Sequence, residues 1–390
     1  MKRSNLCHRT LALGAELLRP DEGSQNQAHS GRLASLDGWR AFSILLVLGS
    51  HCKFTAGFPS GLTRWANWLF DGDLGVRFFF AISGFLITWL LILEENQCGR
   101  ISLKHFYIRR ALRILPVYFA FLLILVALQW LTPFSQTTLT WVGNLTLTRN
   151  FIGTSWTSGH LWSLSVEEQF YLLWPGLFLI SGIGSNLPKA VFVLALPMVI
   201  APIWRIITYL KLYPSMLGPA FGDWSFFKYF DCLAIGCLCA FLLARKPHFL
   251  LQHLAHSWKP AVVAGVLILT PYVLSRKLTF ELLTVPLGYS LQGCGFGILM
   301  LQSTLFPTRR GYQALNWSWV SRLGGLSYSI YIWQQLFSTK PSNFGLPNVW
   351  WLSFPGWLLP VLVVSFVSYY AFERPCMNLR RFFRLTPANG

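Results

Sequence analysis

The chain has 390 residues, of which 54% are hydrophobic and 12% are charged, and its net charge is +18. Soluble domains carry about 25% charged residues, so this composition excludes a soluble globular protein and indicates an integral membrane protein. The basic residues lie at the ends of apolar segments, a pattern that reflects membrane topology and argues against nucleic-acid binding.

Polar and basic residues fill the first part of the chain, so we expect a cytoplasmic tail over 1–34. We expect a membrane domain over 35–376 and a second cytoplasmic tail over 377–390. The apolar stretches are long enough to cross a bilayer as helices, which predicts an all-α polytopic fold with about ten transmembrane helices. The excess of Arg and Lys on one side predicts an inner (cytoplasmic) membrane protein with both termini in the cytoplasm. The predicted spans are 39–57, 72–94, 111–131, 161–182, 189–210, 226–244, 260–275, 282–304, 320–338 and 354–373.

The first predicted span carries an Arg and a His eleven residues apart. Eleven steps of about 100° make almost three turns, so Arg40 and His51 share a helix face, about 16 Å apart along the axis. A lone histidine in a span is about as often a structural residue as a functional one. Asp37 lies one turn before Arg40, near the same stripe, and an aligned set of ionisable groups in hydrocarbon indicates a site. A neutral imidazole can accept a proton from an attacking hydroxyl, so His51 is a candidate general base.

The second span contains Ser83 and Gly84, small residues that suit close packing between helices. We interpret Ser83 as a packing residue or hydrogen-bond donor rather than a nucleophile. The sequence has no Gly-x-Ser-x-Gly motif, which argues against a serine hydrolase.

The third span begins with two arginines, Arg110 and Arg113, that are neighbours on one helical face. Paired guanidinium groups suit phosphates, which accept bidentate hydrogen bonds from them. The alternative interpretation is that these arginines only set the topology of the inner helix end.

The fourth span carries Glu167 about 9–10 Å below its outer boundary, counted by helical rise. His51 reaches a similar depth from the other side, so the two groups could form a dyad. In the alternative interpretation Glu167 and Glu168 are interfacial and stabilise a helix N-terminus through the macrodipole. The eight cysteines include no Cys-x-x-Cys pair, and no cluster has metal-ligand spacing, so we expect no metal and no bound cofactor.

Taken together, five motifs resemble the acyltransferase-3 family of integral membrane acyltransferases from about Leu36 to Pro375. The supporting residues that we single out are Asp37, Ser83, His160, Trp162, Gln334 and Glu373. The motifs are Leu-Asp-Gly-x-Arg-Ala followed by His51, Phe79–Phe85, Tyr107–Arg113, His160–Glu167 and Glu373-Arg374-Pro375.

The resemblance implies a ten-helix enzyme that takes an acyl group, most often acetyl, from cytoplasmic acyl-coenzyme A as co-substrate. It implies transfer to a hydroxyl, often on a carbohydrate or glycoconjugate at or beyond the membrane. Carried over, His51 is the catalytic residue and Glu167 the functional acid, and Arg40, Arg110 and Arg113 bind the coenzyme A phosphates. Some relatives append an extracellular esterase-like domain, which we do not expect here.

One position departs from the family pattern. The stretch Ser327–Gln334 matches a late motif that frequently ends in His, and here that position is Gln334. An amide can form hydrogen bonds but cannot titrate, so the sequence does not support a general acid or base role at this position.

The residues and the resemblance together suggest a mechanism. An extended pantetheine arm is comparable in length to the about 16 Å between Arg40 and His51, so phosphates at the inner surface would place the thioester near His51. We predict direct transfer to a bound hydroxyl with His51 as base, and a transient acyl-His51 as the alternative. A transporter with intramembrane His, Glu and Arg is the rival function, and coenzyme A dependence separates the two.

Overall fold

The computed structural model describes residues 33, 35–212, 224–254, 258–276 and 280–383. Within these ranges the regular elements are helices, and the one β-type contact is an isolated bridge between Ala56 and Ser353. The prediction of an all-α protein is therefore confirmed. The predicted tail over 1–34 lies outside the described residues apart from Leu33, and the tail over 377–390 is described only as far as Phe383.

A helix lies at each of the ten predicted spans. Five helical segments, ending in α4, α5, α8, α10 and α13, are long and apolar enough to cross a membrane, or six if bent α11 and α12 form one span. The chain is therefore of membrane type, and the number of ten spans stays a prediction. The helices at the predicted spans are α2 (Leu36–His51), α4 (Gly72–Cys98), α5 (Leu103–Leu131), α7 (Leu161–Ser181), α8 (Leu187–Tyr209), α10 (Phe226–Arg245), α12 (Lys259–Arg276), α13 (Glu281–Leu305), α14 (Ser318–Ser338) and α15 (Leu358–Ser368); shorter ones are α3 (Thr63–Leu69), α6 (Thr138–Leu145), α11 (Pro247–Leu254) and α16 (Arg374–Leu379).

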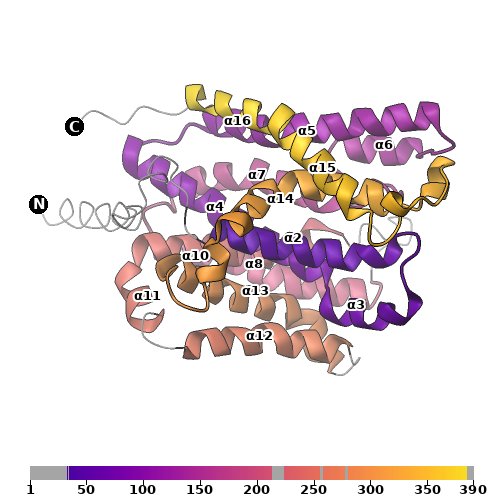
Figure 1. Ribbon diagram of the computed structural model, residues 1–390. Coiled ribbons are helices and arrows are strands. Elements are labelled where there is room, and N and C mark those ends of the chain that lie inside the picture. The colour runs from indigo at the N-terminus through magenta and orange to yellow at the C-terminus, as the bar shows by residue number, and fades with distance from the viewer. Residues whose placement is uncertain (1–32, 34, 213–223, 255–257, 277–279, 384–390) are drawn as a thin grey trace, which may run out of the picture.

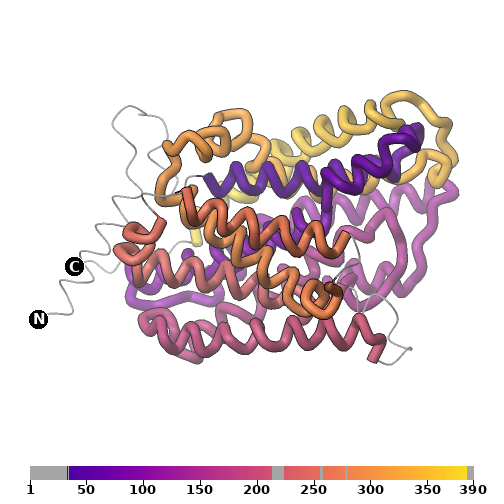
Figure 2. The backbone as a smooth tube through the Cα atoms, turned by 90° about the horizontal axis from the view of Figure 1, so that it is seen from below, coloured from indigo at the N-terminus to yellow at the C-terminus, as the bar shows by residue number. Residues whose placement is uncertain are grey.

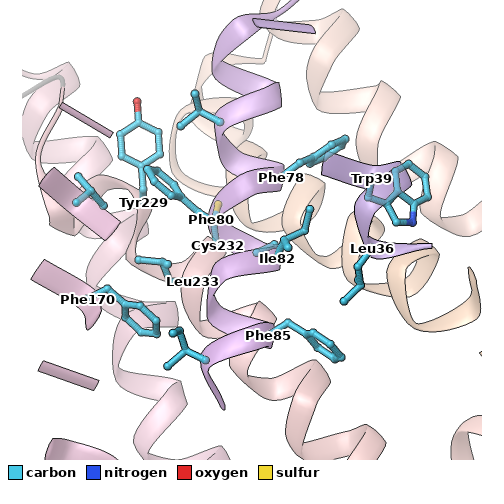
Figure 3. Packing of buried hydrophobic residues seen from close by; sticks show 14 of the residues in the cluster. Leu36, Trp39, Phe78, Phe80, Ile82, Phe85, Phe170, Tyr229, Cys232 and Leu233 are labelled. Atoms are coloured by element: carbon cyan, nitrogen blue, oxygen red, sulfur yellow. The ribbon is translucent and has the colours of Figure 1, made fainter. Parts of the chain in front are cut away.

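The long helices form one bundle with roughly aligned axes, because they extend along the same direction in two views turned by 90° (Figures 1 and 2). Helix α4 lies in the interior of the bundle. Its Phe78, Phe80, Ile82 and Phe85 lie between α2, which contributes Leu36 and Trp39, and α10, which contributes Tyr229, Cys232 and Leu233 (Figure 3).

Local sequence explains where these helices begin and end. The Asp71 carboxylate accepts a hydrogen bond from the Leu74 N–H at 3.0 Å and caps the start of α4. The helix ends at Gly99, whose φ of 66° is a conformation that glycine adopts at no steric cost. Ser102 then caps α5 by accepting from the His105 N–H at 3.4 Å. This short turn therefore connects α4 directly to α5.

Ionic contacts fasten the end of the bundle where α4 meets α5. The Arg109 guanidinium contacts the Glu94 carboxylate at 2.5 Å and donates to the Phe383 carbonyl at 2.7 Å. At the opposite end, Arg276 contacts Asp71 at 3.2 Å. The two ends are thus held by separate sets of contacts, and Arg109 links the α4–α5 turn to the C-terminal part of the described chain.

The last predicted span, 354–373, differs from a regular helix. Helix α15 begins at Leu358 and is followed by a π-helical turn over Tyr369–Glu373 before α16. Such turns are rare and often lie at functional sites. This turn buries Glu373, whose Oε2 accepts a hydrogen bond from Ser329 Oγ of α14 at 2.9 Å.

Glycines let α4 and α10 approach until their backbones touch. A Cβ atom built on Gly84 would lie 2.0 Å from the Leu233 carbonyl oxygen, and one on Gly236 would lie 2.0 Å from the Ala81 carbonyl oxygen. Both neighbours are backbone atoms, which cannot turn aside as a side chain can. The close packing predicted for the second span is thus found at Gly84.

Replacing Gly84 with Ala should therefore separate two helices of the core. Overpacking of this kind costs about 1–3 kcal/mol of stability, and we expect a lower melting temperature in detergent, measured by fluorescence-detected size exclusion. The matched control is Gly265→Ala in α12, where an added Cβ meets nothing within 4 Å. Equal melting temperatures for the two variants would contradict this account of the α4–α10 contact.

Candidate functional site

A cavity lies between α2, α4, α5, α7 and α14 inside the bundle, with an empty volume of about 730 Å³ that is partly open to solvent. It brings together five of the residues singled out in the sequence. The rest of its wall is mixed, with apolar side chains from α4 and hydroxyl groups from α7 and α14. The five are Arg40, Ser83, Arg110, Arg113 and Glu167; the other residues of the wall are Val76, Phe79, Phe80, Ile82, Leu86, Ile114, Ser163, Leu164, Tyr171, Ser327, Tyr328 and Tyr331.

Three guanidinium groups meet at this cavity. Arg40 forms an ion pair with Asp37 at 3.7 Å, which confirms that these two residues share one face of α2. The Arg110 guanidinium lies over the Tyr171 ring, 4.9 Å from its centroid. Among the described residues, neither Arg110 nor Arg113 forms an ion pair within 4.0 Å. The cavity therefore has an excess of positive charge, which favours an anionic ligand.

The Glu167 carboxylate is held in the cavity wall by two hydroxyl groups. Its Oε1 accepts a hydrogen bond from Ser83 Oγ at 2.7 Å, and its Oε2 accepts a longer one from the Tyr171 hydroxyl at 3.4 Å. Tyr171 follows Glu167 by four residues, so α7 places both on one face. Ser83 is thus a hydrogen-bond donor here, one of the two roles that its sequence context predicts.

His51 lies at the last residue of α2 and does not line the cavity. Its Nδ1 is 2.7 Å from Oε1 of Gln334, a side chain with no exposed surface. The imidazole is only partly buried, and its ring lies 5.6 Å from that of Trp156 and 6.3 Å from that of Phe54. Tyr331, which does line the cavity, precedes Gln334 by three residues, about 4.5 Å along α14. The imidazole therefore lies near the end of the cavity at which Tyr331 lies.

The two acid–base candidates have separate partners. In the described part of the chain the structure contains no hydrogen bond or ion pair between His51 and Glu167, although both are fixed by neighbouring side chains. The direct dyad considered from the sequence is therefore not formed in this conformation. Helical rise gives the depth of a residue, whereas contact also depends on the direction in which each side chain points.

His160 lies at the start of α7, buried and close to the region of His51. Its backbone N–H donates to Gln335 Oε1 at 3.0 Å, and its ring lies 5.5 Å from that of Tyr331. Neither ring nitrogen has a hydrogen-bond partner among the described residues. Trp162 instead packs in an aromatic group, with ring distances of 5.0 Å to Tyr229 and 6.1 Å to Phe80. His160 is thus a buried histidine near the site, whereas Trp162 supports α7 against its neighbours.

Sequence reasoning missed the tyrosines of the cavity. The Tyr331 hydroxyl is hydrogen-bonded to Ser163 Oγ, and the Tyr328 hydroxyl donates to the Ile114 carbonyl at 2.7 Å. A signal was present, because Tyr328, Tyr331 and Gln334 recur every three residues and so lie on one side of a helix. Within the described residues no group of three or more His, Cys, Asp or Glu could hold a metal ion.

Comparison with known proteins agrees with the motifs. YrhL of Bacillus subtilis has the provisional curated name of a peptidoglycan O-acetyltransferase. It is 26% identical over 379 residues, and the match covers 89% of this chain and 55% of YrhL. Peptidoglycan O-acetyltransferase OatA of Listeria monocytogenes is 25% identical over 341 residues, 81% of this chain and 51% of OatA. O-acetyltransferase OatA of Staphylococcus aureus is 34% identical over 159 residues, 37% of this chain and 24% of that protein.

The chain spans about half of the length of the first two relatives. No solved structure matches it significantly. The family model described as an acyltransferase domain (Acyl_transf_3) matches residues 33–374, a range that contains the whole cavity wall and His51. The resemblance seen in the five motifs is therefore confirmed, and the chain belongs to the acyltransferase-3 family.

Proposed function

We propose that this protein is a membrane O-acyltransferase that moves an acyl group, acetyl in the first instance, from acyl-coenzyme A to a hydroxyl of a carbohydrate acceptor. The observation that carries the proposal is the meeting of Arg40, Arg110 and Arg113 in one cavity near His51. Family membership supports the reaction type. Two relatives have curated names with peptidoglycan as the acceptor, so peptidoglycan is the acceptor that we propose.

The donor enters at the arginine end of the cavity. Coenzyme A carries phosphates, and guanidinium groups bind phosphates through charge-assisted, bidentate hydrogen bonds. Arg40 lies about 16 Å from His51 along α2, so anchored phosphates leave the thioester at the opposite end of the cavity. The excess of Arg and Lys at this end of the helix bundle supports a cytoplasmic donor and cytoplasmic termini. It also supports an inner-membrane location and a membrane domain over 35–376.

The reaction follows from the chemistry of His51. The neutral imidazole takes the proton of the acceptor hydroxyl as its oxygen attacks the thioester carbonyl. The carbon–sulfur bond then breaks, and the thiolate of coenzyme A receives the proton from the imidazolium. Glu167, fixed by Ser83 and Tyr171, orients the donor or the acceptor by hydrogen bonding rather than by contact with His51. Transfer through acyl-His51 is the alternative order of events.

The proposal is tested with purified protein in nanodiscs, acetyl-coenzyme A labelled in the acetyl group, and peptidoglycan glycan strands. We expect label in the glycan and free coenzyme A in equal amounts, with release faster when glycan is present. Empty nanodiscs are the control. If neither acetyl-coenzyme A nor longer acyl-coenzyme A yields free coenzyme A or labelled glycan, the acyltransferase proposal is wrong and a transporter assay takes its place.

A further inference from the structure

We propose that Gln334 is a positioning residue that holds His51 in the tautomer with the proton on Nδ1, leaving Nε2 as the proton acceptor. The inference rests on the proposed function, because it concerns the base of that reaction. It assigns a task to a position where the family frequently has His and this chain has an amide.

The orientation of the Gln334 amide in this structure gives the direction of the hydrogen bond. Gln334 Oε1 lies 2.7 Å from His51 Nδ1, and a carbonyl oxygen can only accept, so Nδ1 carries the proton. A neutral imidazole has a single N–H proton, so a proton on Nδ1 leaves a lone pair on Nε2. The described residues include no hydrogen-bond partner for Nε2, and the side chain is only partly buried, so this atom is available to a hydroxyl.

The opposite orientation of the amide has a different consequence. If the Gln334 NH₂ group faced His51, it would donate to Nδ1, and Nε2 would carry the proton and lose its capacity as a base. The number of hydrogen bonds does not choose between the two amide orientations. With the oxygen toward His51, Gln334 Nε2 has no partner among the described residues, and with the NH₂ group toward His51, Gln334 Oε1 would have none. The requirement for a base on the accessible nitrogen chooses the orientation with the oxygen toward His51.

The surroundings make Gln334 a rigid support. Its side chain has no exposed surface, and it lies on α14 beside Gln335. Gln335 holds the neighbouring loop, because its Nε2 donates to the Trp156 carbonyl at 2.5 Å. The Trp156 ring in turn lies 5.6 Å from His51 and limits rotation of the imidazole. The adjacent amides of Gln334 and Gln335 on α14 therefore fix the His51 ring and the neighbouring Trp156 segment together.

Two substitutions separate an accepting from a donating side chain. Gln334→Glu keeps an acceptor and removes the donor, so we expect kcat to stay within about threefold of wild type. Gln334→Leu removes both, and we expect kcat to fall about 10²–10³-fold with KM for acetyl-coenzyme A unchanged, the range in which a positioned base contributes. The control is Gln292→Leu, which removes another buried amide, on α13 away from the cavity, and should leave kcat unchanged.

The outcomes distinguish failure of this inference from failure of the proposed function. Loss of activity in Gln334→Glu equal to that in Gln334→Leu would mean that Gln334 donates, and would overturn the tautomer. Wild-type kcat in Gln334→Leu, while His51→Ala is inactive, would remove Gln334 from the mechanism and leave the base in place. Activity in His51→Ala would instead contradict the role of His51 as the base, and absence of acyl transfer in the wild type would contradict the proposed function itself.

A spectroscopic readout tests the same point without catalysis. In protein labelled with ¹⁵N-histidine, the ring shifts of neutral His51, assigned by comparison with His51→Ala, should show a protonated Nδ1 and an unprotonated Nε2. Gln334→Leu should move these shifts toward the other tautomer. A protonated Nε2 in the wild-type protein would overturn the inference even if the Leu variant did not fold.

Discussion

Replacing His51 with Ala is expected to reduce acyl transfer by about 10²–10⁴-fold, the contribution of a general base, because no second base among the described residues forms a hydrogen bond with His51. The fold should survive. The substitution leaves Gln334 Oε1 as a buried acceptor without its partner, which costs about 1–3 kcal/mol of stability. The measurement is the rate of labelled acetyl transfer to glycan, with monodispersity in detergent as the check of folding.

A histidine control separates this effect from the loss of any imidazole. His253 lies exposed on α11, where its Nδ1 contacts the Phe249 carbonyl of the same helix at 2.8 Å. His253→Ala should transfer acetyl at the wild-type rate. Transfer by His51→Ala at that same rate would exclude His51 as either base or nucleophile, and would direct attention to His160, whose ring nitrogens have no described partner.

The second large effect is expected at the arginines of α5. Removing one charge-assisted hydrogen bond costs about 1.5–3 kcal/mol, which is roughly 10–150-fold in binding. Arg110→Ala and Arg113→Ala should each raise KM for acetyl-coenzyme A by about this factor, and the double variant by a larger one. We expect kcat at saturating donor to change little, because the phosphates lie far from the reacting atoms.

The adjacent arginine is the control for this pair. Arg109 lies outside the cavity wall and contacts Glu94 and the Phe383 carbonyl, so Arg109→Ala should lower stability and leave KM unchanged. A donor that lacks the 3′-phosphate of coenzyme A extends the test as a double-mutant cycle. If removing the 3′-phosphate lowers affinity by the same factor in the wild type and in both variants, the arginines do not bind that phosphate. Equal KM values for acetyl-coenzyme A in the wild type and all variants would contradict a phosphate site at these arginines.

The sequence predicts the helices well because hydropathy reports burial in lipid directly. Helix α7 was expected over 161–182 and lies at Leu161–Ser181, and α10 was expected over 226–244 and lies at Phe226–Arg245. The first span was expected to reach residue 57, yet α2 ends at His51 and a 3₁₀ turn follows over Cys52–Phe54. Apolar residues continue past His51, so hydropathy alone could not locate this helix end.

The candidate site was predicted in part. Motif order indicated Arg40, Arg110, Arg113 and Glu167, and the structure brings all four to one cavity. The partner of His51 could not be predicted, because Gln334 lies 283 residues further along the chain and meets it only through the packing of α14 on α2. Glycine allows that packing: a Cβ on Gly324 would lie 1.8 Å from the Asp37 carbonyl oxygen.

Helix α2 carries its cationic residue near one end and its imidazole at the other, and this placement gives the proposed reaction a direction in space. Coenzyme A would enter and leave on the arginine side, whereas the acyl group would depart on the imidazole side bound to a new oxygen. Coenzyme A would never cross the membrane, and only the acyl group would change sides. Cleavage of the thioester would then drive a vectorial step, so that transfer of the acyl group to its acceptor and movement of that group across the membrane become one event.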